Sequence, residues 1–291
     1  MMHGSPPKAA AGLAERYILT DMRAKKSLGQ HFLTSPAIAR EIAATAELSS
    51  KDTVLEVGPG KGMLTRALLE RGARVIALEK DLRLIAPLKE IFSGPIKSGQ
   101  LEILYEDALE FLPEAHGLRP GGYKLVANIP YYITGALLRK FLEGNTQPSV
   151  LVLMVQNEVA GRITARDGKE SILSLSVKTY GKVKKVRKVP ATVFRPVPKV
   201  DSAVIKVNAI NKDFFKKFDE KSFFTLIHAA FGQKRKFLKN NLSAQFSKTD
   251  ISKAFEACRI SEKARAEDLP IETWQCLASE LLKPGTGRSV E

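Results

Sequence analysis

The chain has 291 residues, a formal net charge of +15 and a pI of about 9.7. A chain of this length can bury a substantial core, in one large domain with a smaller one beside it. The positive excess favours a polyanionic partner, with nucleic acid first, over a merely basic soluble protein. The longest strongly apolar run, 150–155, is too short to cross a bilayer, so we expect no membrane segment.

Cysteine and histidine usage predicts no metal site. Cys258 and Cys276 lie far apart without metal-ligand spacing, and the histidines are scattered. We therefore expect no structural disulfide and a reducing, cytoplasmic compartment. Residues 1–24 have neither a periodic pattern nor a signal-peptide core, and we expect a disordered leader there.

From Thr53 onward the pattern alternates strand and helix. Helical spacing is seen at 63–70 and 82–92. Apolar strands are predicted at 54–57, 74–78, 101–105, 123–127 and 150–155, with later strands at 172–178 and 202–207. Strands separated by helix-length segments predict an α/β domain over 25–210, with a parallel sheet and helices on both faces.

The composition changes near residue 210. From Lys212 glycine is rare, and Phe223, Ile227 and Phe231 share one face at helical spacing. A further amphipathic helix is predicted within 264–282. We expect a small C-terminal all-α domain over 211–291.

A glycine-rich turn follows the first strand. Gly58, Gly60 and Gly62 allow close backbone approach to a ligand, but the dinucleotide pattern needs glycine where Met63 stands. Glu79 ends the next strand, where a carboxylate can accept hydrogen bonds from ribose hydroxyls. Asp107 ends the third strand and can accept one from an adenine amino group. The set predicts a nucleoside-containing cofactor at the carboxyl edge of the sheet.

Asn128, Ile129, Pro130 and Tyr131 close the fourth strand. The Asn128 side chain and the Ile129 carbonyl can accept hydrogen bonds from an exocyclic amine, and Pro130 biases Ile129 to an extended backbone. Tyr131 can stack on a base that has left its helix. This combination predicts a nucleic-acid adenine methyltransferase.

Phe194 lies in a proline-rich loop, where it could cover the other face of the base or could simply anchor the loop in the core. Two basic clusters are candidate phosphate contacts, although each could be only a solvated face. The clusters comprise Lys184, Lys185, Arg187, Lys188 and Arg195, and then Lys234, Arg235 and Lys236.

Taken together, these motifs resemble the KsgA-type (RsmA) rRNA adenine dimethyltransferases, a family with a Rossmann-like class I methyltransferase fold. The resemblance runs from about Lys25 to the last helix. It is carried by the segment 26–33, the glycine turn, Glu79, Asp107, the segment 128–131, the segment 194–203 and the segment 229–236.

The resemblance implies S-adenosyl-L-methionine as methyl donor and no metal. It implies donor contacts from Gln30, His31, Leu33, Gly58, Gly60, Gly62, Glu79, Lys80, Asp107, Ala108 and Asn128. It also implies a substrate: two adjacent adenosines in the 3′-terminal hairpin loop of small-subunit (16S) rRNA, each dimethylated during late assembly. The expected partner is the immature small subunit, the helical domain would bind RNA or ribosome, and the default state is a monomer.

Two rivals stay open. An Erm-type enzyme shares the catalytic half but acts on large-subunit rRNA, and the basic run 233–236 in the helical tail favours the KsgA type. A non-catalytic assembly or transcription factor could keep the fold only to bind nucleic acid. The intact segment 128–131 argues against that rival, without excluding a second, binding-only role.

Overall fold

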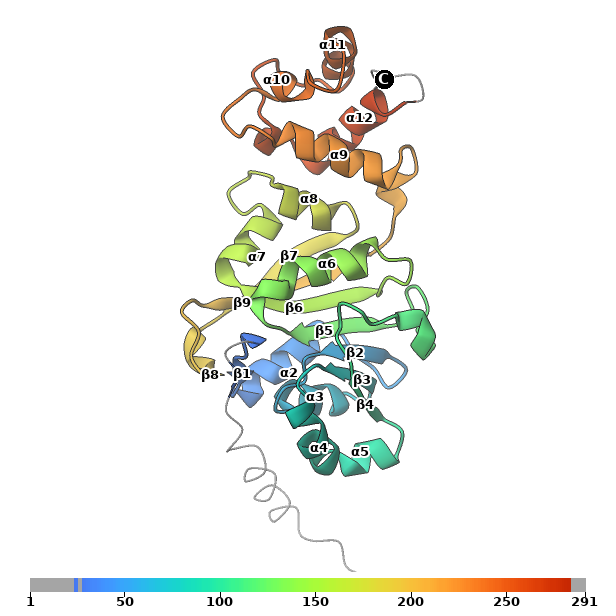
Figure 1. Ribbon diagram of the computed structural model, residues 1–291, viewed down its shortest axis with the longest axis vertical. Helices are drawn as coiled ribbons and strands as arrows, with labels where there is room; N and C mark the ends of the chain where they lie inside the picture. The colour runs from blue at the N-terminus through green and yellow to red at the C-terminus, as the bar shows by residue number, and fades with distance from the viewer. Residues whose placement is uncertain (1–23, 26–27, 284–291) are drawn as a thin grey trace, which may run out of the picture. The chain divides into compact units, whose positions relative to one another are not determined.

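The structure is a computed structural model that describes residues 24–25 and 28–283 (Figure 1). The chain forms two compact units. The first contains the described residues up to Asn157 together with Val186–Lys206, and the second contains Glu158–Lys185 together with the described residues from Val207. The units therefore interleave along the sequence, whereas the prediction placed a single boundary near residue 210. The predicted leader, 1–24, lies outside the described residues except for Ala24.

A seven-stranded sheet carries the candidate site. Its strand order is β4-β3-β2-β5-β6-β9-β7 (Figure 1). The strands are β2 (Thr53–Val57), β3 (Arg74–Glu79), β4 (Leu101–Tyr105), β5 (Lys124–Asn128), β6 (Val150–Gln156), β7 (Lys182–Val189) and β9 (Ser202–Asn208). The first five pair in parallel. The predicted α/β class is confirmed.

Helices follow the strands because the chain must cross over between parallel neighbours. The helices of the first unit are α2 (Pro36–Thr45), α3 (Met63–Leu69), α4 (Leu82–Ile91), α5 (Ser93–Lys97) and α6 (Thr134–Glu143). Ser35 and Asp81 cap α2 and α4, each accepting a hydrogen bond from a backbone N–H of the first turn. Ile42, Leu68 and Leu88 pack against one face of the sheet in a common core.

A second, small sheet joins distant segments of the chain. Strand β1 (Phe32–Leu33) pairs antiparallel with β8 (Phe194–Arg195), so that Leu33 lies opposite Phe194. Short 3₁₀ turns complete the first unit: η2 (Pro113–His116), η3 (Tyr131–Ile133) and η4 (Ala191–Val193). This pairing holds the proline-rich loop after β8 against the segment before α2.

The second unit is helical. Its elements are α7 (Asn157–Thr164), α8 (Ile172–Lys178), η5 (Asp213–Phe215), α9 (Glu220–Ala230), α10 (Leu238–Leu242), α11 (Lys248–Ala257), η6 (Ala266–Asp268) and α12 (Ile271–Leu281). Phe223, Leu242 and Trp274 are buried in its core. The helical character predicted after Lys212 is therefore present.

The predicted strand at 172–178 is wrong, because this segment is helix α8. Ser171 caps the helix by accepting a hydrogen bond from the Ser174 N–H, and the Ser174 hydroxyl accepts one from the Ser171 N–H. Leu175 packs in the same core as α9 and α12. An apolar run of this length fits either a strand or a helix by pattern alone, and here the cap and the packing favour the helix.

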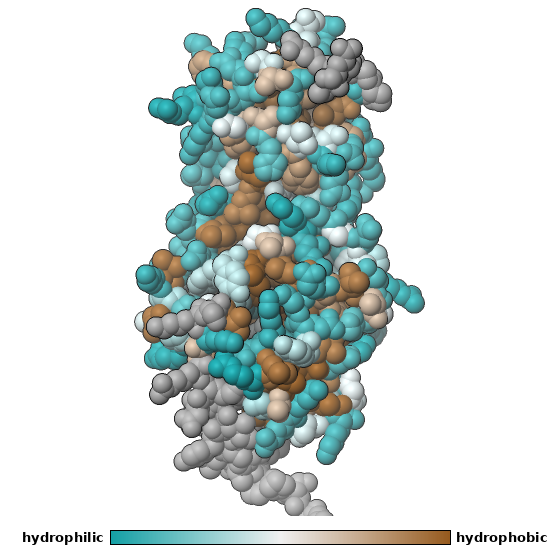
Figure 2. All heavy atoms as spheres, in the orientation of Figure 1, coloured by the Kyte–Doolittle hydropathy of each residue, from teal (hydrophilic) through white to brown (hydrophobic). Residues whose placement is uncertain are grey.

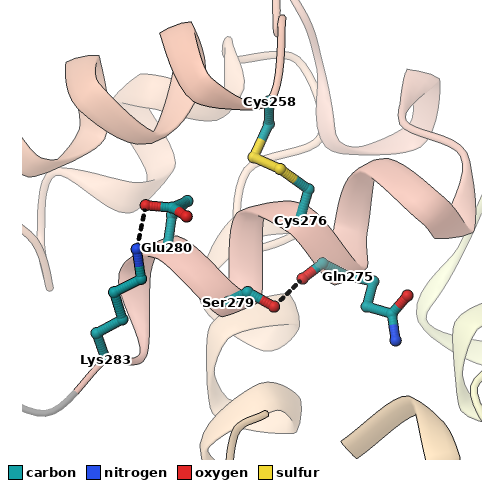
Figure 3. Close-up of a disulfide and its surroundings, with 6 residues drawn as sticks. All are labelled: Cys258, Gln275, Cys276, Ser279, Glu280 and Lys283. Carbon is teal, nitrogen blue, oxygen red and sulfur yellow. Dashed lines mark hydrogen bonds and ion pairs between the residues drawn. A yellow bond between two sulfur atoms is a disulfide. The ribbon is translucent and has the colours of Figure 1, made fainter.

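The expectation of no structural disulfide is also wrong. Cys258, directly after α11, is bonded to Cys276 on α12, with their Cα atoms 5.8 Å apart (Figure 3). Helices α11 and α12 pack against each other, which brings two residues 18 positions apart within bonding distance. Cysteine usage therefore gives no support for a reducing compartment.

Hydrophilic side chains cover much of the face seen in Figure 2, with smaller hydrophobic patches between them. The large apolar side chains that are exposed include Leu82, Tyr105, Leu112 and Tyr132. Within the described ranges, no helix has both the length and the apolar character needed to cross a membrane.

Candidate active site

Four neighbouring strands, β4, β3, β2 and β5, end at one edge of the sheet, where a cavity opens. Because parallel strands end on the same side, segments far apart in sequence meet here. The lining includes most of the predicted site residues: Gln30, His31, Leu33, Gly58, Gly60, Glu79, Lys80, Asp107, Ala108, Asn128, Ile129, Pro130, Tyr131 and Phe194. Gly62 is the one predicted donor residue that does not line it.

The glycine turn lies against β3 and beside the end of β5. The Gly58 N–H donates to the Leu78 carbonyl at 2.9 Å. Gly58 has a φ of 72°, and a Cβ at this position would lie 3.6 Å from the Asn128 carbonyl oxygen. The donor turn and the predicted acceptor segment are therefore adjacent. Gly62 serves packing instead, since a Cβ there would lie 2.5 Å from the Phe92 ring.

The Glu79 carboxylate is buried at the end of β3. It accepts hydrogen bonds from the N–H groups of Gly60 at 3.1 Å and Asp81 at 2.8 Å. Burial raises the pKa of Glu79, and these two bonds counteract that effect. The Gln30 amide donates to Asp81 at 2.9 Å, so the N-terminal segment is held to the same strand end.

Asp107 follows β4 and is paired with Lys80. Its carboxylate accepts hydrogen bonds from the Lys80 ammonium at 2.5 Å and the Leu109 N–H at 3.0 Å. Burial opposes ionisation, but these bonds prevail and hold the pKa of Asp107 below its usual value. The Asp107 carboxylate is therefore an ionised acceptor, and Ala108, the next residue, is buried.

Asn128 is the last residue of β5, and the next residue, Ile129, is buried. Pro130 precedes η3, which begins at Tyr131. The Tyr131 hydroxyl is 2.7 Å from the Ser202 hydroxyl. Burial raises the pKa of Tyr131, which is therefore a neutral phenol near neutral pH. The ring is thus fixed at both its backbone and its hydroxyl end.

The loop after β8 forms another wall. Phe194 is only 1% exposed and belongs to the core as well as to the cavity lining. The His31 Nδ1–H donates to the Pro196 carbonyl at 2.7 Å, and its ring stacks at 6.2 Å from Tyr131. Segments before α2 and after β8 therefore support the aromatic ring of Tyr131.

The predicted basic residues belong to several elements of the chain. Strand β7 is an edge strand that carries Lys184, Lys185, Arg187 and Lys188. Arg187 pairs with Glu41, and Lys188 pairs with Asp201 at 2.8 Å. The Arg195 guanidinium donates to the Thr192 and Phe194 carbonyls. In the second unit, Lys234, Arg235 and Lys236 occupy an exposed segment between α9 and α10.

Sequence reasoning missed several residues at the site. Lys61 and Tyr132 line the cavity, and Tyr132 is 66% exposed. Glu56 is fully buried directly before the turn. Each of these residues lies inside or next to one of the two motifs, and this position in the sequence could have marked it as a candidate. Among the residues that the structure describes, no cluster of three metal-ligating side chains occurs.

A family model described as ribosomal RNA adenine dimethylase matches residues 21–283. The chain belongs to this family. Proteins named ribosomal RNA small subunit methyltransferase A are similar to this chain. The one from Dehalococcoides mccartyi strain CBDB1 is 41% identical over 96% of both chains. The one from Halothermothrix orenii is 37% identical over 90% of this chain and 89% of its own.

Two solved structures also resemble this chain. The crystal structure of a dimethyladenosine transferase from Plasmodium falciparum superposes with a TM-score of 0.74 at 29% identity, covering 88% of this chain and 99% of that one. The crystal structure of the 23S rRNA methyltransferase ErmE superposes with a TM-score of 0.70 at 28% identity, covering 87% and 100%.

Proposed function

We propose that this protein transfers methyl groups from S-adenosyl-L-methionine to N6 of two adjacent adenosines in the 3′-terminal hairpin loop of small-subunit rRNA. The products are dimethyladenosines, formed during small-subunit assembly. One observation carries the proposal: the segment 128–131 and the turn at Gly58 lie side by side in one cavity. The named relatives support the choice of the small subunit over the large one.

The cavity residues fit a nucleoside donor. Glu79 would accept hydrogen bonds from the ribose hydroxyls and Asp107 from the adenine amino group, because Glu79 ends β3 and Asp107 closely follows the neighbouring β4 at the cavity. Lys80 keeps Asp107 ionised, Ala108 would contact the adenine ring, and Gln30, His31 and Leu33 would close the N-terminal side. When bound, the donor supplies an electrophilic methyl group.

Acceptor activation needs no general base in this proposal. The lone pair of adenine N6 is delocalised into the ring, so the nitrogen must become tetrahedral as the new bond forms. The Asn128 side-chain oxygen and the Ile129 carbonyl would accept hydrogen bonds from its two N–H groups and favour that geometry. Tyr131 would stack on the base, and Phe194 would bound the pocket from the loop side. Catalysis would come from positioning and aligned acceptors.

The basic residues would hold RNA through its phosphates without reading its sequence. Lys184 on the β7 edge and the segment 234–236 are exposed cations suited to this role, although Lys234 also pairs with Glu267 at 3.8 Å. The partner would be an immature small subunit, and the protein would act as a cytoplasmic monomer. The helical region 211–291 would contribute to ribosome binding.

The test is a radiolabelled methyl-transfer assay on small subunits that lack methylation in the hairpin loop, with large subunits in parallel. Dimethyladenosine in the small-subunit loop is the expected result. Label only in large-subunit RNA would instead favour the Erm-type rival, because ErmE, a similar solved structure, is named a 23S rRNA methyltransferase. Donor binding without label in either particle would favour a binding-only assembly factor.

A further inference from the structure

Lys61 lies between Gly60 and Gly62, in the middle of the glycine turn. Lys61 lines the same cavity as Glu79 and Asn128, and so does Phe32, over whose ring the Lys61 ammonium lies. The glycines of this turn let the backbone approach a ligand, whereas Lys61 adds a long cationic side chain to the same turn.

The Lys61 ammonium has no carboxylate partner among the described residues. It lies instead over the Phe32 ring, with Nζ 5.1 Å from the ring centroid. Partial burial lowers the pKa of Lys61, which means that the cation has lost part of its hydration. By contrast, Lys80, the other lysine of the cavity lining, is paired with Asp107. A partly desolvated, unpaired cation favours the binding of an anion.

The donor has one anionic group. Its sulfonium and ammonium are cationic, its ribose and adenine are neutral, and only the α-carboxylate of the amino-acid end is negative. In the proposed arrangement, Glu79 and Asp107 take the nucleoside, which leaves the amino-acid end toward Gly58. Lys61 is three residues from Gly58 in the same turn.

We propose that the Lys61 ammonium binds the α-carboxylate of S-adenosyl-L-methionine, while the Phe32 ring holds the lysine side chain over the turn. This inference rests on the proposed donor site. It makes Lys61 a donor-binding residue that discriminates amino-acid-bearing donors from those without a carboxylate. The same cation could otherwise contact an RNA phosphate, and the experiment separates that outcome.

The experiment compares two ligands and two proteins by calorimetry without RNA. The ligands are S-adenosyl-L-methionine and decarboxylated S-adenosylmethionine. The proteins are the full chain and Lys61→Met, which keeps the length of the side chain but removes its charge. Lys89→Met, on the exposed surface of α4 and outside the cavity lining, is the matched control. Thermal melts establish that each variant folds.

Lys61→Met should weaken binding of the complete donor about tenfold, a typical loss for one charged contact in a partly exposed site. It should leave binding of the decarboxylated donor within about twofold, because that ligand offers no partner for the cation. Lys89→Met should change neither dissociation constant.

Equal weakening for both ligands, or no weakening for either, would overturn the role of Lys61 while leaving the proposed function intact. Normal binding of both donors by Lys61→Met, together with weaker binding of the substrate RNA in a separate titration of the same variants, would assign Lys61 to an RNA phosphate instead. If the unaltered protein binds neither donor, the donor site itself is wrong and this inference is wrong with it.

Discussion

Burial of Glu56 makes the stability of this protein depend on pH in a way that one substitution removes. Glu56 lies on β2 two residues before Gly58 and is 0% exposed. Neither carboxyl oxygen has a hydrogen-bond partner among the described residues. Burial raises the pKa of Glu56 to about 8; nearby Thr65 lowers it in part, and the neighbouring Glu79 carboxylate raises it further. The folded protein therefore holds Glu56 protonated at neutral pH.

The sign of the effect follows from the two pKa values of Glu56. The folded value of about 8 exceeds the model-peptide value of 4.5, so the folded state binds this proton more tightly than the unfolded state. The resulting stability is fully present below pH 4.5 and is lost as the pH rises through 8. Because Glu56 is fully buried, solvent does not screen this effect. From pH 6 to pH 9 the free energy of unfolding should fall by about 2–3 kcal/mol on this account.

Glu56→Gln keeps the shape of the side chain and removes the titration. Urea denaturation at several pH values from 6 to 9 measures the free energy of unfolding of both proteins. The difference between them should change by about 2–3 kcal/mol across this range, in favour of the variant at high pH. Other groups, Glu79 among them, titrate in both proteins and largely cancel. Parallel pH profiles would refute the buried, protonated state of Glu56.

Three further predictions concern catalysis and the helical unit. Asn128→Ala should lower kcat at least about 100-fold and should weaken donor binding far less, since acceptor alignment is lost while the other donor contacts remain; near-normal turnover would contradict this. Tyr131→Ala should lower kcat/KM for RNA about 10- to 100-fold, as expected for a lost base stack, whereas Tyr131→Phe should retain most activity. Replacing Cys258 and Cys276 by Ala should lower stability by about 3 kcal/mol, judged by chemical denaturation under oxidising conditions, because the bond closes a loop of about 18 residues. Equal stability of both proteins under those conditions would show that the bond does not form in solution.

Much of the first unit could be predicted from the sequence, because its signals are local. Short apolar strands that end in Gly58, Glu79, Asp107 and Asn128 indicate a parallel sheet, and parallel strands place their ends at one edge. The meeting of the two motifs in one cavity could therefore be predicted without any information on tertiary contacts.

Features that depend on tertiary packing could not be predicted in this way. The segment 172–178 has an apolar run that suits either a strand or a helix, and burial of Leu175 among helices favoured the helix. The bond between Cys258 and Cys276 depends on how α11 packs on α12. The environment of Lys61 depends on Phe32, which lies far away in sequence and reaches the turn through the small β1–β8 sheet.

Transfer to adenine N6 in the small-subunit loop through Asn128 is tested most directly by mass-spectrometric mapping of small-subunit rRNA. Undermethylated subunits are first incubated with S-adenosyl-L-methionine and either the unaltered protein or Asn128→Ala. Two adjacent dimethyladenosines with the unaltered protein, and none with the variant, is the predicted result. Methylation elsewhere in the RNA, or the same two dimethyladenosines with both proteins, would contradict the account.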